Sequence, residues 1–410
     1  MNEKKTEIII ERLVNRVEQA NTYFLQSIGS VIKKLRNLRP TEAQQLAQIL
    51  KYNGNYEEIV SEIAKYTGLN IRDIDDIFSN YAKKDQMFYK QFYEYRNIPF
   101  VEYAKNDVLK RQTQALANIV KGEMYNFTRS NVLGYTIRDL QGRPQFVGLR
   151  ETYNRVLDEA LINVGTGKET FDSAMNKIMV EIGGSGLKTI EYESGRSMRL
   201  DSAVRMHLKG RLRELHNENQ MIFGEEFGAD GVEISVHFNP APDHQNAQGR
   251  QFSNEEYNKL SEGLEAMDYT GKKVTLDHDD NGSYRPISEM SCYHYIFSII
   301  LGISQPEYNE EELQKIIDEN NEGFNFENKH YTMYQGEQLL RKIELELRKS
   351  KDTQILARSS NNAELVGKMQ NRITQLTNKY RDILKASGLK SKLERARVSQ
   401  YRRINVKNMK

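Results

Sequence analysis

The sequence predicts an α+β protein with a mostly helical N-terminal region, a central α+β domain and a long basic helical C-terminal arm. Three observations support this fold class. Apolar residues recur at helical spacing in both outer regions of the 410-residue chain. The middle instead alternates helix-like stretches with short apolar runs and with loops rich in Asn, Pro, Gly and Asp. A content of 38% apolar and 28% charged residues is typical of long helices with much surface in water.

Residues 1–130 form the first expected region, which is helical. Apolar positions from Ile9 to Ile28 approximate one helical face. Pro40 predicts a helix break, and Thr41 is suited to cap the helix that follows. The region is therefore expected to consist of several helices joined by short turns.

Aromatic side chains are concentrated between residues 87 and 103. In the simpler interpretation, one helix packs these rings against its neighbours. In the second interpretation, the segment is a docking surface for a partner protein, because tyrosine suits interfaces that are half exposed to water. The docking candidates are Phe88, Tyr89, Phe92, Tyr93 and Tyr95.

Residues 131–304 form the predicted central α+β domain. A helical block that begins before this domain is expected from about 104 to 182, with candidate breaks at 140–144 and 165–167. From about residue 190 the pattern becomes mixed. The elements predicted there are a helix at 201–227, a strand at 231–238, a helical piece at 254–267 and a strand or helix at 293–303.

An acidic connector, 305–329, and a basic helical arm, 330–410, complete the predicted organisation. Residues 305–327 carry eight acidic side chains against one lysine. Residues 341–410 carry 19 Lys and Arg against 6 acids, a difference of +13 that the net charge of +2 for the whole chain conceals. A break is expected at Ser387 and Gly388.

The end of the arm is a candidate DNA-binding segment. Residues 378–410 contain 11 Lys and Arg against 2 acids. Such a segment neutralises phosphates and releases counterions without reading sequence, and Tyr401 is able to stack on a base. The other interpretation is a solvated helix or tail without a ligand. The basic candidates are Lys390, Lys392, Arg395, Arg397, Arg402 and Arg403.

Four side chains of the central region form a candidate metal site: His237, His244, Cys292 and His294. Two residues that are two apart in an extended segment share a face, so Cys292 and His294 are able to reach one ion. A thiolate with imidazoles suits tetrahedral zinc. If all four side chains bind, the zinc is structural and ties the segment 232–250 to the segment around Cys292. The alternative is a buried cysteine that packs as a small apolar residue.

Composition and motifs exclude several other classes. The single cysteine excludes an internal disulfide framework and favours synthesis in a reducing compartment. The longest apolar run, 295–303, is far shorter than a membrane span, and no secretory signal is expected. The glycine-rich stretches at 165–169 and 183–189 lack the spacing of a phosphate-binding loop. A protein without a membrane anchor is expected.

An ordered set of short segments carries a resemblance to a known family: 160–161, 165–167, 185–187, 190–196, 200–201, 204–205, 232–235, 237, 242–244, 248–250, 292–294, 302–304, 331, 334–335, 338 and 341. In the order and approximate spacing of these segments, over about residues 155–350, the sequence closely resembles the phage minor capsid protein 2 family of tailed bacteriophages. The layout is also similar to that of the phage head-morphogenesis domain. The family usually has Asn-Cys-Arg-His before the closing apolar run, whereas this chain has Ser291-Cys292-Tyr293-His294, without the arginine.

The resemblance implies a structural protein of the virion that is made in the host cytoplasm and lies in the capsid interior near the portal vertex. Its implied partners are the portal protein, the major capsid protein, packaged double-stranded DNA and other copies of itself. Ejection with the genome is a further expectation. The alternative is a metal-dependent hydrolase or nuclease carried in the particle, with His237, His244 and Cys292 at the metal and Asp243 or Glu233 as the acidic group.

Overall fold

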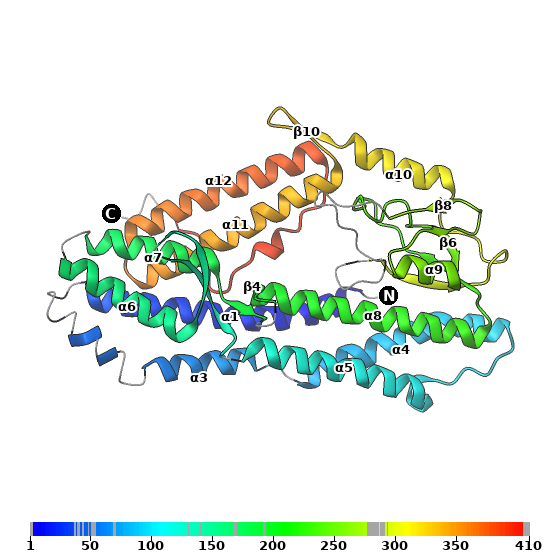
Figure 1. Cartoon of the computed structure of the whole chain (residues 1–410), viewed down its shortest axis with the longest axis horizontal. Coiled ribbons are helices and arrows are strands. Elements are labelled where there is room, and N and C mark those ends of the chain that lie inside the picture. Colours follow the sequence, from blue (N-terminus) through cyan, green and yellow to red (C-terminus); the bar gives the residue numbers. More distant parts are fainter. Residues whose placement is uncertain are drawn as a thin grey trace. The chain divides into compact units, whose positions relative to one another are not determined.

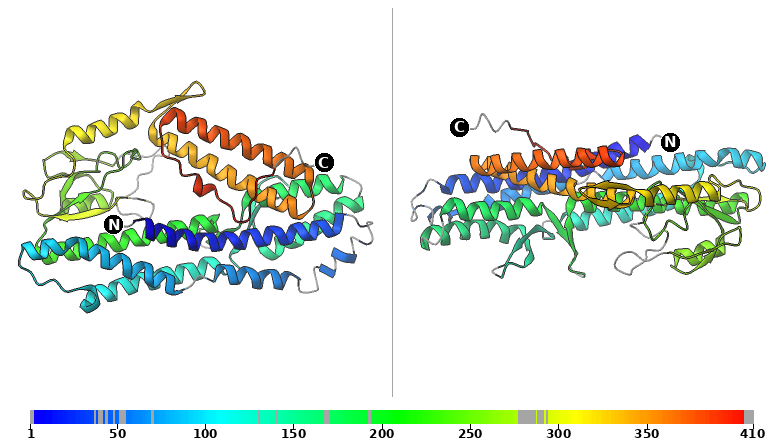
Figure 2. Two further views of the ribbon diagram at one scale, coloured as in Figure 1. Left: turned by 180° about the vertical axis from the view of Figure 1, so that it is seen from behind. Right: turned by 90° about the horizontal axis from the view of Figure 1, so that it is seen from above.

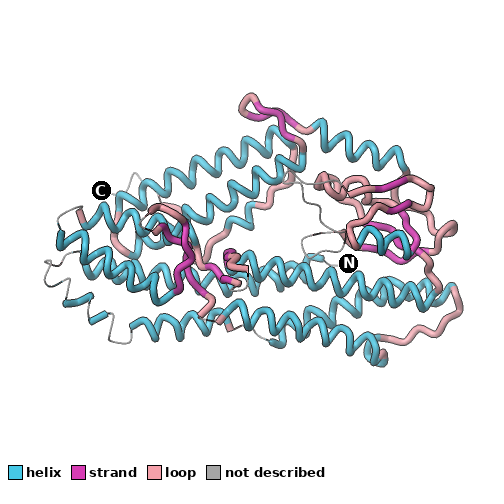
Figure 3. Tube along the Cα trace, viewed as in Figure 1, coloured by secondary structure: helices cyan, strands magenta, loops and turns pink. Residues whose placement is uncertain are grey.

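The computed structural model describes residues 3–36, 38, 42, 45–47, 49–50, 55–68, 71–129, 131–139, 141–166, 170–191, 194–276, 287, 292 and 294–404. Long helices alternate with short antiparallel strands (Figures 1 and 3), which confirms the α+β class with helical outer regions. Among the described helices, none combines the length and the hydropathy that crossing a bilayer requires.

The chain divides into two compact units, each built from three separate segments. Unit 1 comprises 1–10, 70–122 and 205–338. Unit 2 comprises 11–69, 123–204 and 339–410. The division of the sequence into four successive regions stays a prediction.

Unit 1 contains a helical layer whose core is aromatic. Its main helices are α4 (Ile71–Tyr95), α5 (Asp107–Thr128) and α8 (Leu200–Phe227), the last two of which continue into unit 2. Tyr89 and Tyr93 of α4 are buried against Phe223 and Phe227 of α8. The Tyr89 and Phe227 rings stack with their centroids 5.6 Å apart. Aromatic packing of this kind stabilises a helix pair beyond the burial of apolar area alone.

A buried polar network joins the same two helices to the sheet of unit 1. The Nδ1 of His216 on α8 lies 2.9 Å from Asp85 Oδ1 on α4, and its Nε2 lies 3.0 Å from the carbonyl oxygen of Ile296. Asn219 and Gln220 donate to the same Asp85 carboxylate. Because buried polar groups are costly without partners, this network fixes the position of the sheet on the helices.

The strands of unit 1 are short and antiparallel. A three-stranded sheet has β5 (Gly231–Ile234) between β6 (Gln251–Ser253) and β9 (Ile296–Ile299), with Val232 opposite Phe252 and Ser298. The segment 293–303, predicted as strand or helix, thus supplies a strand. The smaller elements are α9 (Asn254–Ser261), β7 (Ala266–Met267) with β8 (Lys273–Val274), η1 (Tyr103–Lys105), α10 (Glu310–Glu322) and β10 (Phe324–Phe326) with β11 (Lys329–Tyr331).

The acidic connector of the sequence contains a capped helix. The side chain of Asn309 accepts from the backbone N–H of Glu312, whose own side chain accepts from the backbone of Asn309. Glu310 forms two hydrogen bonds with Arg250, of 2.6 and 2.8 Å. Arg250 and Lys272 lower the pKa of Glu310 to about 2. The helix α10 is therefore held both by its cap and by a paired guanidinium.

In unit 2, the expectation of one helical block from 104 to 182 is wrong for residues 133–148. These residues form the hairpin of β1 (Leu133–Arg138) and β2 (Pro144–Gly148). The strand order is β2-β1-β3-β4, with β3 at Lys188–Ile190 and β4 at Ser197–Arg199. Two short runs rich in β-branched and aromatic residues, joined by a turn, favour strands over a helix.

The helices of unit 2 pack closely on α11. A Cβ on Gly183 would lie 2.6 Å from the Cα of Thr353, and one on Gly29 would lie 2.4 Å from the Cβ of Ser359, so glycine permits both approaches. The helices α11 and α12 lie side by side in both views (Figure 2), joined by a 3.0 Å hydrogen bond from Tyr380 to Glu344. The helices are α1 (Glu3–Arg36, which begins in unit 1), α3 (Asn55–Thr67), α6 (Leu149–Thr166), α7 (Phe171–Ser185), α11 (Met333–Ser359, whose first residues lie in unit 1), α12 (Ala363–Ser387) and η2 (Leu393–Ala396).

Candidate metal centre and interaction surfaces

The pairing of β5 with β9 brings the candidate metal ligands together. The two strands are antiparallel, so the residues after β5 lie beside the residues before β9. This pairing continues past the strands, because Ser235 donates from its backbone to the carbonyl oxygen of Tyr295 at 2.8 Å. Successive turns then return the chain from 241 to 249, where Gly249 donates to the carbonyl oxygen of Ile234 at 2.7 Å. His244 lies within these turns, and Cys292 and His294 precede β9.

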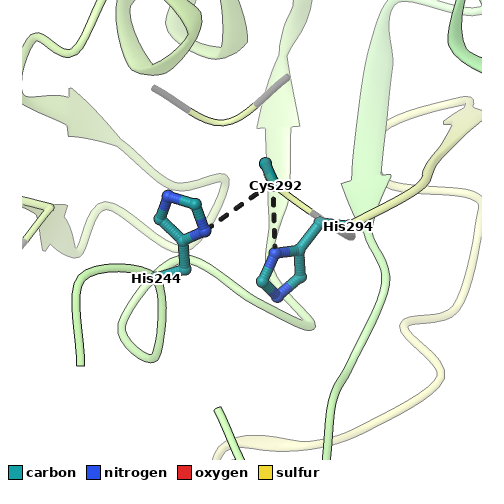
Figure 4. A group of neighbouring side chains, drawn as sticks. All are labelled: His244, Cys292 and His294. Atoms are coloured by element: carbon teal, nitrogen blue, oxygen red, sulfur yellow. Dashed lines mark hydrogen bonds between the residues drawn. The ribbon is translucent and has the colours of Figure 1, made fainter. Parts of the chain in front are cut away.

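Three of the four predicted ligands form one group. The ligand atoms of His244, Cys292 and His294 all lie within 4.8 Å of one another. Cys292 Sγ is 3.7 Å from His244 Nδ1 and 3.5 Å from His294 Nδ1 (Figure 4). In tetrahedral zinc sites, bonds of about 2.3 Å to sulfur and about 2.05 Å to nitrogen place these atoms about 3.5 Å apart. The two separations thus fit two edges of a zinc tetrahedron.

Both imidazoles direct Nδ1 toward the thiol and Nε2 toward an oxygen. His294 Nε2 lies 3.4 Å from Gln248 Oε1, and His244 Nε2 lies 3.8 Å from Asp243 Oδ2. Gln248 is itself held, since its Oε1 accepts from the backbone N–H of His237 at 2.9 Å. For His294, the amide oxygen near Nε2 favours the tautomer that carries hydrogen there, which leaves the Nδ1 lone pair for an ion.

The group lies in the interior of unit 1. The exposed fractions are 1% for His244, 1% for Cys292 and 4% for His294. Burial of a thiol and two imidazoles side by side is costly unless they hydrogen-bond or bind an ion. The arrangement is able to hold a divalent ion, and its burial restricts the access of large substrates.

The remaining residues discussed for this site lie outside the three-membered group. The ring of His237 packs against His294 with centroids 4.5 Å apart. Glu233, an acidic candidate for the hydrolase alternative, instead accepts from Gln251 at 2.8 Å and from the backbone of Glu307 at 3.1 Å. Burial raises the pKa of Glu233. Ser291 and Tyr293, where the sequence departs from the family pattern, lie outside the described residues.

The basic C-terminal segment folds back onto unit 2 as far as it is described. The helix α12 ends at Ser387, and the left-handed backbone of the capping residue Gly388, with a φ of 71°, confirms the predicted break. Ile404 donates from its backbone to Gln370 at 2.9 Å, and Thr22 donates to the carbonyl oxygen of Ser399 at 3.3 Å. The ring of Tyr401 is covered by the ammonium of Lys351, 5.1 Å from its centroid.

The six basic candidates differ in exposure. Lys392 and Arg395 are half-buried, whereas the other four have exposed side chains. The backbone N–H of Lys392 also donates to the hydroxyl of Tyr380 at 2.9 Å. A DNA surface on this segment would therefore be formed mainly by the exposed cations Lys390, Arg397, Arg402 and Arg403.

The five aromatic docking candidates on α4 separate into two sets. Tyr89 and Tyr93 are core residues, with exposed fractions of 1% and 3%. Phe88, Phe92 and Tyr95 are 55%, 37% and 85% exposed. The docking hypothesis is therefore restricted to the exposed set, because buried rings are unavailable to a partner.

Sequence reasoning missed a buried cluster of charged side chains in unit 2. Arg199 contacts Asp201 and Asp352, each at 3.1 Å, and Arg348 also pairs with Asp201. Glu18 of α1 lies in the same electrostatic environment. These side chains come from distant parts of the chain, so no local pattern identifies them.

The fold and the site define an α+β protein of long helices with a buried thiol–imidazole group. Residues 1–385 match the family model described as phage minor capsid protein 2. The chain therefore belongs to this family, a family of phage structural proteins, and the resemblance seen over residues 155–350 is confirmed. Neither the curated proteins nor the solved structures contain a match.

Proposed function

We propose that this protein is a minor structural component of a tailed-phage head that binds the portal inside the capsid, contacts the packaged DNA and leaves with it. The observation that carries the proposal is the family match, which extends over nearly the whole chain. Two surface features support the finer assignments: the exposed aromatic side chains of α4 and the exposed cations of the C-terminal segment.

The position in the particle is tested on the virion itself. Mass spectrometry of purified particles should detect this chain, and a reconstruction without imposed symmetry should show its density beside the portal on the inner side. Particles that have released their DNA should have lost the chain. Its absence from full particles would overturn the proposal, and its retention after DNA release would overturn the ejection step.

Portal binding is expected to depend on the exposed aromatic side chains of α4. In the full-length protein, Phe88→Gln combined with Tyr95→Gln should weaken co-purification with the portal protein at least tenfold, because loss of central aromatic contacts typically costs more than about 1 kcal/mol each. The control is Tyr125→Gln, which replaces a 68% exposed tyrosine of α5. Equal binding by both variants would contradict an α4 docking surface.

DNA binding is expected to depend on salt through the C-terminal cations. Replacing Arg402 and Arg403 by glutamine should reduce the slope of log K against log salt by about 2, because each phosphate contact contributes about 0.9. The matched control replaces Lys33 and Lys34, an exposed adjacent pair near the end of α1. Fluorescence anisotropy with labelled duplex DNA measures both slopes. Affinity that does not respond to salt would argue against phosphate binding.

A further inference from the structure

We propose that His244, Cys292 and His294 bind one Zn²⁺ ion per chain, and that this ion is a structural clip within unit 1. The clip ties the turns after β5 to the segment before β9. The inference stands apart from the proposed function, because it concerns the integrity of the fold and not a place in the virion.

Geometry and ligand chemistry select the ion. The sulfur–nitrogen separations of 3.7 and 3.5 Å fit the edges of a zinc tetrahedron. One thiolate and two neutral imidazoles form a ligand set that suits zinc better than the oxygen-preferring Mg²⁺ or Ca²⁺. No fourth His, Cys, Asp or Glu joins the group within the part of the chain that the structure describes.

The charges around the group also balance. Zn²⁺ with one thiolate carries a charge of +1, and the Asp243 carboxylate next to His244 offsets it. Asp243 is 2% exposed, so this compensation occurs in the interior, where an uncompensated charge is costly. Gln248 is a positioning residue, which orients His294 through the nitrogen that faces away from the sulfur.

Burial and strand pairing assign a structural role. The three side chains are nearly inaccessible, and they lie where Ser235 and Tyr295 continue the β5–β9 pairing. The segments that supply His244 and Cys292 are 48 residues apart in the sequence. An ion that joins such distant segments stabilises the folded state by the free energy with which it binds.

Metal content is the direct test. Full-length protein purified without a metal-binding tag should contain one zinc per chain by mass spectrometry of the elements, and Cys292→Ser should abolish stoichiometric zinc. His237→Ala should retain zinc. Zinc-free wild-type protein, or zinc retained in Cys292→Ser, would overturn the proposal. A loss in His237→Ala equal to that in Cys292→Ser would overturn the three-ligand assignment.

Two measurements on the wild type remain decisive if a variant fails to fold. Replacement of zinc by Co²⁺ should give the thiolate-to-cobalt charge-transfer band of a tetrahedral site, and its absence would overturn Cys292 as a ligand. A strong chelator should lower the melting temperature, and an unchanged melting temperature after complete zinc removal would overturn the structural role. Cleavage of DNA that requires zinc and is lost in His244→Ala would likewise overturn a purely structural role.

The positioning residue provides a graded test. Gln248→Ala should weaken zinc binding 10- to 100-fold in competition with a chromophoric chelator, as is typical for partners of ligating histidines. The control is Gln251→Ala, because Gln251 is also buried in unit 1 but donates to Glu233. Equal zinc affinity for both variants would contradict the role assigned to Gln248.

Discussion

Replacing Arg199 by methionine is expected to lower the free energy of unfolding by about 3–5 kcal/mol, the largest effect expected of a single substitution in unit 2. Arg199 at the end of β4 is 7% exposed and pairs with Asp201 and with Asp352, the latter fully buried. Burial alone would lower the pKa of Arg199, but the carboxylates of Asp201 and Asp352 raise it by more than burial lowers it. The pKa of Arg199 is therefore above its usual value. Methionine would leave the Asp352 carboxylate in the interior without this cation.

Chemical denaturation of the wild type and of Arg199→Met measures the loss in the free energy of unfolding. The dependence of this loss on pH is a second measurement. Burial raises the pKa of Asp352, so a protonated Asp352 should make the loss smaller at low pH. The control is Arg143→Met, which removes a 73% exposed guanidinium paired with Asp139 and should change stability by less than about 1 kcal/mol. Combining Arg199→Met with Asp352→Leu should recover much of the loss, because replacement of a whole buried pair is often neutral. A loss below about 1 kcal/mol for Arg199→Met would contradict the proposed importance of the cluster.

The backbone near Arg199 shows why this cluster has a fixed geometry. Gly186 follows α7 with a φ of 65°, and a Cβ there would lie 2.0 Å from Arg199 Nη1. The glycine therefore satisfies two constraints, the left-handed backbone and the close approach of the guanidinium.

The helices were predictable from the sequence because their signals are local. The break at Gly388 and the apolar periodicity of the C-terminal region depend on residues within a few turns of one another. The hairpin at 133–148 was missed because two short strands between helices give a weaker signal than long helical repeats. The assembly of each compact unit from three segments depends on tertiary packing, which periodicity does not encode.

The candidate metal group shows which parts of the site the sequence could predict and which it could not. Residue chemistry and the Cys-x-His spacing identified His244, Cys292 and His294, all of which the fold brings together. The sequence favoured His237 as a ligand equally strongly, but in the structure its ring packs against His294 outside the group. The sequence did not identify Gln248 as part of the site, because an amide side chain supports a metal site only where it faces the nitrogen of a ligating imidazole. These distinctions depend on side-chain direction, which spacing alone does not fix.

Stability of the wild-type protein is expected to fall as the pH rises from about 4.5 to about 8, and Glu18→Gln should remove a large part of this slope. Burial is the main reason that the pKa of Glu18 is raised from 4.5 to about 8, and the Asp201 and Asp352 carboxylates raise it further against the opposing effect of Arg199 and Arg348. Within this window the folded state keeps a proton that the unfolded state releases. Unfolding is then favoured by higher pH, by up to about 1.4 kcal/mol per pH unit for one group.

The difference between the two proteins isolates Glu18 from other titrating groups. Urea denaturation at intervals from pH 4 to 9 should give stability curves that converge below pH 4.5, where glutamate is protonated in both states, and separate above it, with Glu18→Gln the more stable. Glu58→Gln controls for the loss of a carboxylate, because Glu58 is exposed on α3 and remote in sequence from the cluster. Parallel curves for wild type and Glu18→Gln would show that Glu18 is ionised in the folded state. In that case the attraction of Arg199 and Arg348 for the Glu18 carboxylate would exceed the cost of burying its charge. The cluster would then consist of three ionised carboxylates that pair with two guanidinium groups.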